Sequence, residues 1–366
     1  MRIVFCGGGT AGHVHPALAI SEMIAERYKG AEAVFFGRKG GDENSAITKS
    51  GYPLIELEVE GLARRHPIRS VRAVSLAWRA RSEARELLRE ICPSAVIGTG
   101  GYVSWPVLSA AISLGIPALI HESNASPGLV TRLLGRRCNA VMLGFEAAEM
   151  RLGGAHTVYT GNPVRREIGR LGRREARRRL GIDYGIPLVL SFGGSLGAER
   201  MNAAVLEAVG RSVALPRGTL WVHATGRRHF ESVKAVAGKN TDKGCLRILP
   251  YIEDMPLWLA AADIGVTRGG AMTLAELCAA RLPAIIIPSP NVTDDHQTKN
   301  AEALAEAGAV RLLAESELSG DRLLCEVSPL LSDGGKRAAM AAAYPDGSPG
   351  KTRERIMGVI DEFCRE

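Results

Sequence analysis

Residues 263–304 read DIGVTRGGAMTLAELCAARLPAIIIPSPNVTDDHQTKNAEAL and alternate strand-like segments, turns and helix-like segments. Residues 263–267 predict a short strand, Gly269 and Gly270 turn the chain, and residues 271–280 predict a helix. Residues 284–288 predict a second, fully apolar strand of the kind found inside parallel sheets. This alternation predicts an α/β fold built on a parallel sheet.

The same stretch suggests a nucleotide site. A glycine turn that leads into a helix presents backbone N–H groups and the positive end of the helix dipole, which suit a diphosphate. Glu276, in the early turns of that helix, can chelate a ribose diol. An ordinary turn followed by a solvated glutamate would have the same sequence pattern, so this stretch alone leaves both interpretations open.

The pattern of strand, glycine turn and helix opens each half of the chain. Residues 1–6 predict a strand before GGGTAGH (7–13), and a helix follows over 16–28. The pattern restarts with a strand at 187–192 and GGSLGAERMN (193–202). Further strands are predicted at 33–36, 54–59, 95–97, 118–121, 220–224, 246–249, 265–267 and 284–287. The chain should therefore form two Rossmann-type domains.

The expected seam lies in TGNPVRR (160–166), where Gly and Pro interrupt the pattern. We place the first domain at 1–163 and the second at 164–345. Residues 346–366 predict an amphipathic C-terminal helix that packs back on the first domain.

Length and composition indicate which class of protein the chain belongs to. The 366 residues, 46% hydrophobic and 23% charged, suffice for two globular domains. No apolar run reaches the roughly 18 residues of a spanning helix, and the N-terminus does not read as a signal peptide, so the chain is expected in the cytosol. Seven scattered cysteines without a CxxC pair argue against a zinc site and a disulfide framework.

The net charge of +7 is concentrated in arginines near 64–89 and 165–179, which suit a polyanion or an anionic membrane surface. Within 71–91, an apolar face is expected, with arginines and glutamates elsewhere. The residues of this apolar face are Val74, Trp78, Leu87, Leu88 and Ile91. An interfacial membrane helix and a solvated helix packed on the sheet both fit this pattern.

Several chemistries are disfavoured. Neither glycine motif is followed by GKS or GKT, which weakens the ATPase hypothesis. A dehydrogenase would have an acidic residue at the end of the second strand, but Asp42 and Glu43 come several residues later, which weakens that hypothesis. Without a DxD motif, a metal-bridged diphosphate is not supported. The charge of a leaving group would then be met by helix N-termini and basic side chains.

His13 is the candidate general base, because it lies at the mouth of the first glycine turn beside a helix start. A capping or buried structural histidine fits the same position, and His15 is an equal rival by composition. Asn124 and Ser195 are hydrogen-bonding residues at strand ends, where such residues usually serve as caps.

Taken together and in order, the motifs resemble the MurG family, the bacterial transferases that add N-acetylglucosamine to lipid I to make lipid II. They are GGGTAGHVHPALA, GTGGYVSWP, HESNASPG, TGNPVR, FGGSLGAERMN, PYIEDM and RGGAMTLAELCAARLPAIIIPSPNVTDDHQTKNA. The resemblance implies a GT-B fold, with two Rossmann-like domains whose parallel sheets face each other across a cleft. The first domain would take the lipid-linked acceptor, and the second would take UDP-N-acetylglucosamine.

The resemblance also implies the reaction: inverting transfer to the muramyl 4-hydroxyl in peptidoglycan synthesis, with no metal at the donor site and no cofactor. His13 would be the catalytic base. Donor contacts would come from Thr10, Ala11, Gly12, Asn124, Arg165, Ser195, Ile252, Ala271, Met272, Thr273, Leu274, Glu276, His296 and Gln297. Acceptor contacts would come from Gly100, Gly101, Tyr102, His121 and Glu122.

The implied partners are UDP-N-acetylglucosamine, lipid I and the cytoplasmic face of the inner membrane, with no nucleic acid. Trp78, Arg79, Arg81 and Arg85 would form the membrane surface. The sequence departs from the family at Ala11, where a glycine is usual, at Ser123 in HESN, and at Trp105 with Pro106. Another lipid glycosyltransferase, a UDP-N-acetylglucosamine 2-epimerase and an inactive nucleotide-sugar-binding scaffold stay open as alternatives.

Overall fold

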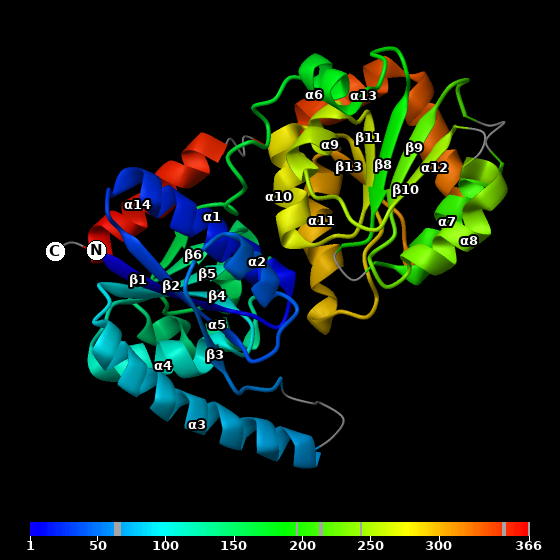
Figure 1. The fold of residues 1–366 in the computed structure, drawn as a ribbon. Helices are drawn as coiled ribbons and strands as arrows, with labels where there is room; N and C mark the ends of the chain where they lie inside the picture. Colours follow the sequence, from blue (N-terminus) through cyan, green and yellow to red (C-terminus); the bar gives the residue numbers. More distant parts are fainter. Residues whose placement is uncertain (62–66, 195–196, 212–214, 242–243, 346–348, 365–366) are drawn as a thin grey trace. The chain divides into compact units, whose positions relative to one another are not determined.

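The structure is a computed structural model that describes residues 1–61, 67–194, 197–211, 215–241, 244–345 and 349–364. The chain forms two compact units (Figure 1). The N-terminal unit comprises Met1–Pro163 and Ser348–Glu366, and the C-terminal unit comprises Val164–Gly347. The chain therefore leaves the first unit once and returns to it at its end.

The N-terminal unit is built on a seven-stranded, wholly parallel sheet of order β3-β2-β1-β4-β5-β6-β7. Its strands are β1 (Arg2–Gly7), β2 (Glu32–Arg38), β3 (Leu54–Leu57), β4 (Ala95–Gly100), β5 (Ala118–Glu122), β6 (Ala140–Leu143) and β7 (Thr157–Tyr159). The order reverses between β1 and β4, which defines the switch point where doubly wound sheets bind ligands.

Helices cover both faces of this sheet, as the strand residues require. Ile3 and Phe5 point to one face and Val4 and Cys6 to the other, and all four are fully buried. The first face packs against α1 (Ala11–Arg27), α2 (Asn44–Lys49) and α14 (Pro349–Phe363). The second packs against α3 (Pro67–Ile91), α4 (Ser104–Leu114) and α5 (Leu129–Leu134).

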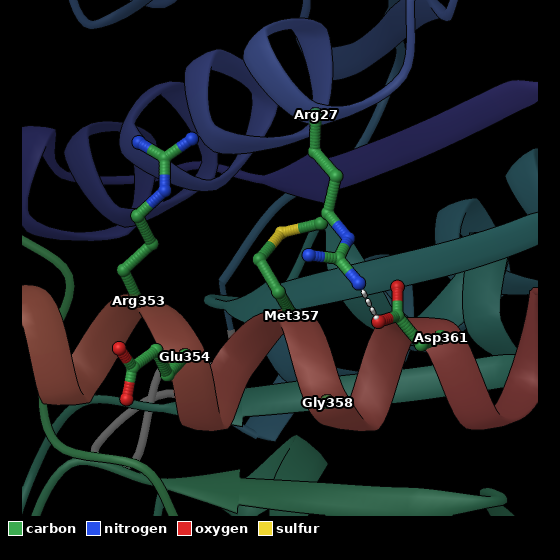
Figure 2. A pocket seen from close by; sticks show the side chains of 6 residues that line it. All are labelled: Arg27, Arg353, Glu354, Met357, Gly358 and Asp361. Atoms are coloured by element: carbon green, nitrogen blue, oxygen red, sulfur yellow. Dashed lines mark hydrogen bonds and ion pairs between the residues drawn. The ribbon is translucent and has the colours of Figure 1, made fainter.

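The C-terminal helix α14 is anchored beside α1. Its buried residues Ile356 and Ile360 join the core of the first face, and Asp361 accepts hydrogen bonds from Arg27 and Tyr28. A hollow of about 360 Å³ lies between the two helices (Figure 2). It is lined by Arg27, Arg353, Glu354, Met357, Gly358 and Asp361. Because Arg27 ends α1, this hollow is at the opposite end of that helix from the glycine turn.

The C-terminal unit repeats the architecture with a six-stranded parallel sheet of order β10-β9-β8-β11-β12-β13. Its strands are β8 (Leu188–Phe192), β9 (Leu220–Ala224), β10 (Leu246–Leu249), β11 (Ile264–Thr267), β12 (Ala284–Ile286) and β13 (Val310–Leu312). The order reverses between β8 and β11, so this unit has its own switch point.

Helices again surround the sheet. One face packs against α7 (Glu199–Gly210), α8 (Phe230–Thr241), α12 (Gly320–Ser332) and α13 (Gly334–Ala343). The remaining helices are α6 (Arg173–Leu180), α9 (Met255–Ala261), α10 (Ala271–Ala280) and α11 (His296–Glu306). Short 3₁₀ turns lie at Gly135–Arg137, Glu146–Arg151, Thr293–Asp295 and Glu315–Glu317.

The prediction of two parallel-sheet Rossmann-like units is confirmed, but the prediction of a single apolar face on α3 is wrong. Leu88 lies in the core together with Ala80 and Ala84, whereas Val74 and Trp78 are exposed. Trp78 instead makes an edge-on contact with Trp105 of α4, with ring centroids 5.4 Å apart. No helix among the described residues is both long enough and apolar enough to span a membrane.

Candidate active site

Two glycine turns meet at the switch point of the N-terminal unit. The turn after β1 and the turn after β4 are joined by a hydrogen bond from Gly8 N to Gly100 O, 3.4 Å long. Helix α1 follows the first turn, with Thr10 at its N-cap; no side chain caps it and no carboxylate lies in its first turn. A helix N-terminus of this kind favours an anionic ligand.

His13 lies between these two turns. Its Nδ1 is 3.0 Å from Gly8 O and 3.3 Å from Thr10 Oγ1. Because a carbonyl oxygen only accepts hydrogen bonds, Nδ1 carries the hydrogen in the neutral ring and Nε2 carries the lone pair. This is the tautomer that a general base needs if Nε2 is to take the proton.

The second turn is shaped to receive the imidazole. Gly100 and Gly101 both have positive φ, +109° and +77°. A Cβ on Gly100 would lie 2.8 Å from His13 Cδ2, and one on Gly101 would lie 1.9 Å from Gly8 O. Glycine is therefore required at Gly101 for both conformation and space.

Tyr102 and Glu43 complete this part of the site. The Tyr102 ring would lie 2.8 Å from a Cβ on Gly9, so it covers the first glycine turn. Burial raises the pKa of Tyr102. Glu43 Oε1 accepts a 2.6 Å hydrogen bond from Gly9 N. The sequence did not predict this role for Glu43, and no spacing rule would have found it.

Glu122 organises the loop that carries Asn124. Its Oε1 accepts hydrogen bonds from Asn124 N and Nδ2, at 3.0 and 3.2 Å, and its Oε2 accepts from Gly128 N and Thr131 Oγ1, at 2.9 and 2.7 Å. His121 is fully buried, 3.3 Å from Gly161 O, and burial lowers its pKa to about 4. Glu122 and His121 thus lie beneath the loop that presents Asn124.

In the C-terminal unit, the turn after β11 is held rigidly. Arg268 donates to Ile287 O and Pro288 O, at 3.0 and 3.2 Å, and pairs with Glu315. A Cβ on Gly269 would lie 2.4 Å from Gln297 O, so helix α11 approaches the turn closely. Gln297 Oε1 also accepts from Ser289 N at 2.9 Å. His296 is the first residue of α11.

Helix α10 begins directly after this turn. Gly270 is its N-cap, no side chain caps it and its first turn holds no carboxylate. Ala271 and Leu274 are buried, so at these positions the helix offers backbone groups rather than side chains to a ligand. Met272 and Thr273 are partly exposed. The N-terminus of α10 is therefore suited to a phosphate.

Arg165 and Glu276 come together beside α10. Arg165 Nη2 lies 3.5 Å from Glu276 Oε1, with side-chain exposures of 38% and 17%. Burial raises the pKa of Glu276, and Arg165 partly offsets this shift. The structure thus brings together two of the predicted donor residues. Ile252 is buried just beyond β10, and Ser195 lies outside the described residues.

No group of three or more His, Cys, Asp or Glu side chains suited to a metal ion occurs in the described part of the chain. Arg165 and the N-termini of α1 and α10 carry full or partial positive charge, whereas Glu43 and Glu276 supply carboxylates. The units thus offer partial and full positive charge to an anionic ligand.

Comparisons with known proteins define the class first. The chain matches the Glycosyltransferase family 28 N-terminal domain over residues 3–143 and the Glycosyltransferase family 28 C-terminal domain over residues 188–353. With its two doubly wound units, the fold is that of a GT-B glycosyltransferase.

Individual relatives define the family more closely. A protein of Limosilactobacillus fermentum named UDP-N-acetylglucosamine--N-acetylmuramyl-(pentapeptide) pyrophosphoryl-undecaprenol N-acetylglucosamine transferase is 39% identical over 95% of this chain and 96% of its own. The crystal structure of Acinetobacter baumannii MurG has a TM-score of 0.72 at 26% identity, covering 99% of this chain and 98% of that one. The chain belongs to the MurG family of glycosyltransferases within family 28.

A more distant structure shares the fold alone. A putative UDP-N-acetylglucosamine 2-epimerase from Listeria monocytogenes has a TM-score of 0.71 at 15% identity, covering 99% of this chain and 96% of that one.

Proposed function

We propose that the chain transfers N-acetylglucosamine from UDP-N-acetylglucosamine to the muramyl 4-hydroxyl of lipid I, giving lipid II with inversion at the anomeric carbon. The name of the Limosilactobacillus fermentum relative describes an N-acetylglucosamine transferase with an N-acetylmuramyl-(pentapeptide) pyrophosphoryl-undecaprenol substrate. That relative matches almost the whole chain, so both units are expected to have the same roles here.

The donor is assigned to the C-terminal unit on one observation: Arg165 and Glu276 meet beside the uncapped N-terminus of α10. In this arrangement the helix N-terminus and Arg165 would receive the diphosphate, and Glu276 would accept hydrogen bonds from the ribose diol. Ile252 would contact the uracil through its backbone, and Gln297 and His296 the sugar. Ser195 is retained as a proposed diphosphate contact from the sequence motif.

The N-terminal unit is assigned to the acceptor and to proton removal. His13 would take the proton of the muramyl 4-hydroxyl at Nε2 as that oxygen attacks the anomeric carbon, while Nδ1 stays bonded to Gly8 O. Thr10, Ala11, Gly12 and Asn124 would approach the donor sugar from this unit. Gly100, Gly101 and Tyr102 would line the acceptor side.

We further propose that no metal takes part at the donor site. As the bond from the anomeric carbon to the diphosphate oxygen breaks, negative charge grows on the departing UDP. Arg165 and the N-terminus of α10 would stabilise that charge. Their positions are fixed before the reaction, so little reorganisation is required.

The exposed part of α3 is proposed as a peripheral contact with the cytoplasmic face of the inner membrane. Val71 is 71% exposed and Trp78 is 55% exposed. The Arg81 guanidinium lies 5.4 Å from the Trp78 ring centroid, and Arg79 and Arg85 are exposed on the same helix. Apolar side chains flanked by arginines suit insertion at an anionic headgroup layer.

The test is a transfer assay with labelled UDP-N-acetylglucosamine and lipid I, with diacylglycerol as a second acceptor. Label should enter lipid I and release UDP. Transfer to diacylglycerol alone would indicate another lipid glycosyltransferase, and donor conversion without any acceptor would indicate an epimerase. UDP binding without turnover on either acceptor would indicate an inactive scaffold.

A further inference from the structure

A continuous line of buried hydrogen bonds crosses the C-terminal unit between β8, β9 and α7. Trp221 Nε1 donates to Ser191 Oγ at 2.7 Å, and Ser191 Oγ lies 2.8 Å from His223 Nδ1. His223 Nε2 lies 2.9 Å from Asn202 Oδ1, and Asn202 Nδ2 donates to Thr225 O at 3.2 Å. All five residues are buried. We call this set the Trp221–Thr225 relay.

The two ends of the relay fix the direction of every bond. An indole N–H only donates and a carbonyl oxygen only accepts. Asn202 must therefore present Nδ2 to Thr225 and Oδ1 to His223, which places the imidazole hydrogen on Nε2. Burial lowers the pKa of His223 to about 4, so the ring is neutral near pH 7 and Nδ1 accepts from the Ser191 hydroxyl.

The relay ends at a carbonyl that is tightly packed against a glycine. A Cβ on Gly197 would lie 2.1 Å from Thr225 O, and Gly197 has φ of +78°. Gly197 N donates to Gly194 O at 3.1 Å, and Asn202 N donates to Ala198 O at 2.8 Å in the first turn of α7. The Asn202 side chain therefore sets the distance between the N-terminus of α7 and the end of β9.

We propose that His223 and Asn202 are positioning residues for the donor diphosphate, which hold Gly197 and the N-terminus of α7 against the end of β9. This inference rests on the proposed function, because it takes the turn before α7 to be part of the donor site. His223 and Ser191 have no exposed surface, so they act on the donor only through Asn202. The relay fixes a geometry in advance, which limits the ordering that binding would otherwise require.

Two substitutions at one position separate positioning from folding. In His223→Gln, the amide nitrogen takes the place of Nε2 and still donates to Asn202, while Ser191 turns its hydroxyl to Val222 O, 3.4 Å away. In His223→Asn, the shorter amide keeps an acceptor for Ser191 but does not reach Asn202. Each variant loses one link of the relay, so we expect both melting temperatures to fall by similar amounts.

UDP binding, measured by calorimetry on the full chain, should distinguish the two variants. We expect a wild-type Kd in His223→Gln and a Kd raised about tenfold in His223→Asn, the factor for about one hydrogen bond. The KM for UDP-N-acetylglucosamine should rise in parallel while kcat changes little. Equal Kd values in the two variants, whether both normal or both raised, would overturn the proposal.

If either variant fails to fold, a measurement on the wild-type protein still tests the proposed hydrogen-bond directions in the relay. The ¹⁵N chemical shifts of His223 should show a neutral ring protonated on Nε2 at pH 6. Protonation on Nδ1, or a charged ring at that pH, would overturn the proposal. Failure of the wild-type chain to bind UDP would count against the proposed function instead, and it would leave the tautomer result unaffected.

Discussion

Arg165 Nη2 lies 3.5 Å from Glu276 Oε1, so the two charged side chains that we assign to the donor also contact each other. Burial of Glu276 raises its pKa and Arg165 opposes that shift. Arg165 thus offsets part of the cost of burying the Glu276 carboxylate. In the proposed complex, donor binding would add a diphosphate to this arrangement, and the ribose hydroxyls would donate hydrogen bonds to Glu276.

Glu276→Ala should weaken UDP binding, since the ribose diol loses its charged acceptor. Hydrogen bonds to a charged group predict a Kd increase of about 10- to 100-fold, measured by calorimetry. Glu276→Gln, which keeps one acceptor oxygen without the charge, should fall between wild type and Glu276→Ala. A wild-type Kd in Glu276→Ala would remove Glu276 from the donor site.

His13→Ala should lower kcat by about 10²–10⁴-fold, the usual contribution of a general base, with little change in UDP affinity. His13→Gln is the matched control, because its amide can occupy the ring position without accepting a proton, and it should be equally inactive. Steady-state transfer kinetics and UDP calorimetry measure the two quantities. Turnover near wild type in His13→Ala would place the base elsewhere.

The triple variant Arg79→Glu, Arg81→Glu and Arg85→Glu should no longer bind vesicles that contain anionic lipid, because it reverses the charge beside Trp78. Each basic residue near such a surface contributes about 1 kcal/mol, so release should be nearly complete in a sedimentation assay. The matched control reverses the charge of three exposed arginines of α6 by the same change to Glu: Arg174, Arg178 and Arg179. Equal release by both variants would contradict a specific role for α3.

Acid should destabilise both units through buried histidines. His121 and His223 each have a pKa lowered to about 4 by burial, below the ordinary 6.5. Between pH 6.5 and pH 4 the unfolded chain binds more protons than the folded chain. The contribution of the two neutral histidines to the free energy of unfolding is therefore fully present above about pH 6.5 and is lost as the pH drops towards 4. Each histidine should cost about 2 kcal/mol at pH 5, measured by urea unfolding.

The pH effect has an internal control. His223→Gln removes one of the two titrating groups, so its loss of stability between pH 7 and pH 5 should be smaller by about 2 kcal/mol. An identical pH dependence in wild type and His223→Gln would contradict the role of His223.

The sequence predicted the two doubly wound units because buried parallel strands read as short apolar runs and each leading strand opens into a glycine turn. It did not predict β6, β7 or β13, which span Ala140–Leu143, Thr157–Tyr159 and Val310–Leu312. Strands this short hold little pattern of their own, so some of them were recognised and these three were not. The strand β12 was predicted because its residues are fully apolar and lie between Pro283 and Pro288.

Parts of the site depend on tertiary contacts that spacing does not encode. Glu43 reaches Gly9 only because the loop after β2 folds back over the first glycine turn. Ser191 and His223 meet through the register of β8 and β9, in which they are direct partners. Arg165 and Glu276 were each predicted from motifs, but their contact was not, since more than a hundred residues separate them.

The proposed function requires the C-terminal unit to hold UDP-N-acetylglucosamine without a metal ion. A crystal structure of the protein with UDP-N-acetylglucosamine, grown in the presence of a chelator, tests this most directly. We expect the uracil at Ile252, the ribose diol on Glu276 and the diphosphate at the N-terminus of α10 beside Arg165. A donor bound at the glycine turns of the N-terminal unit, or a donor that binds only when a divalent cation is supplied, would contradict it.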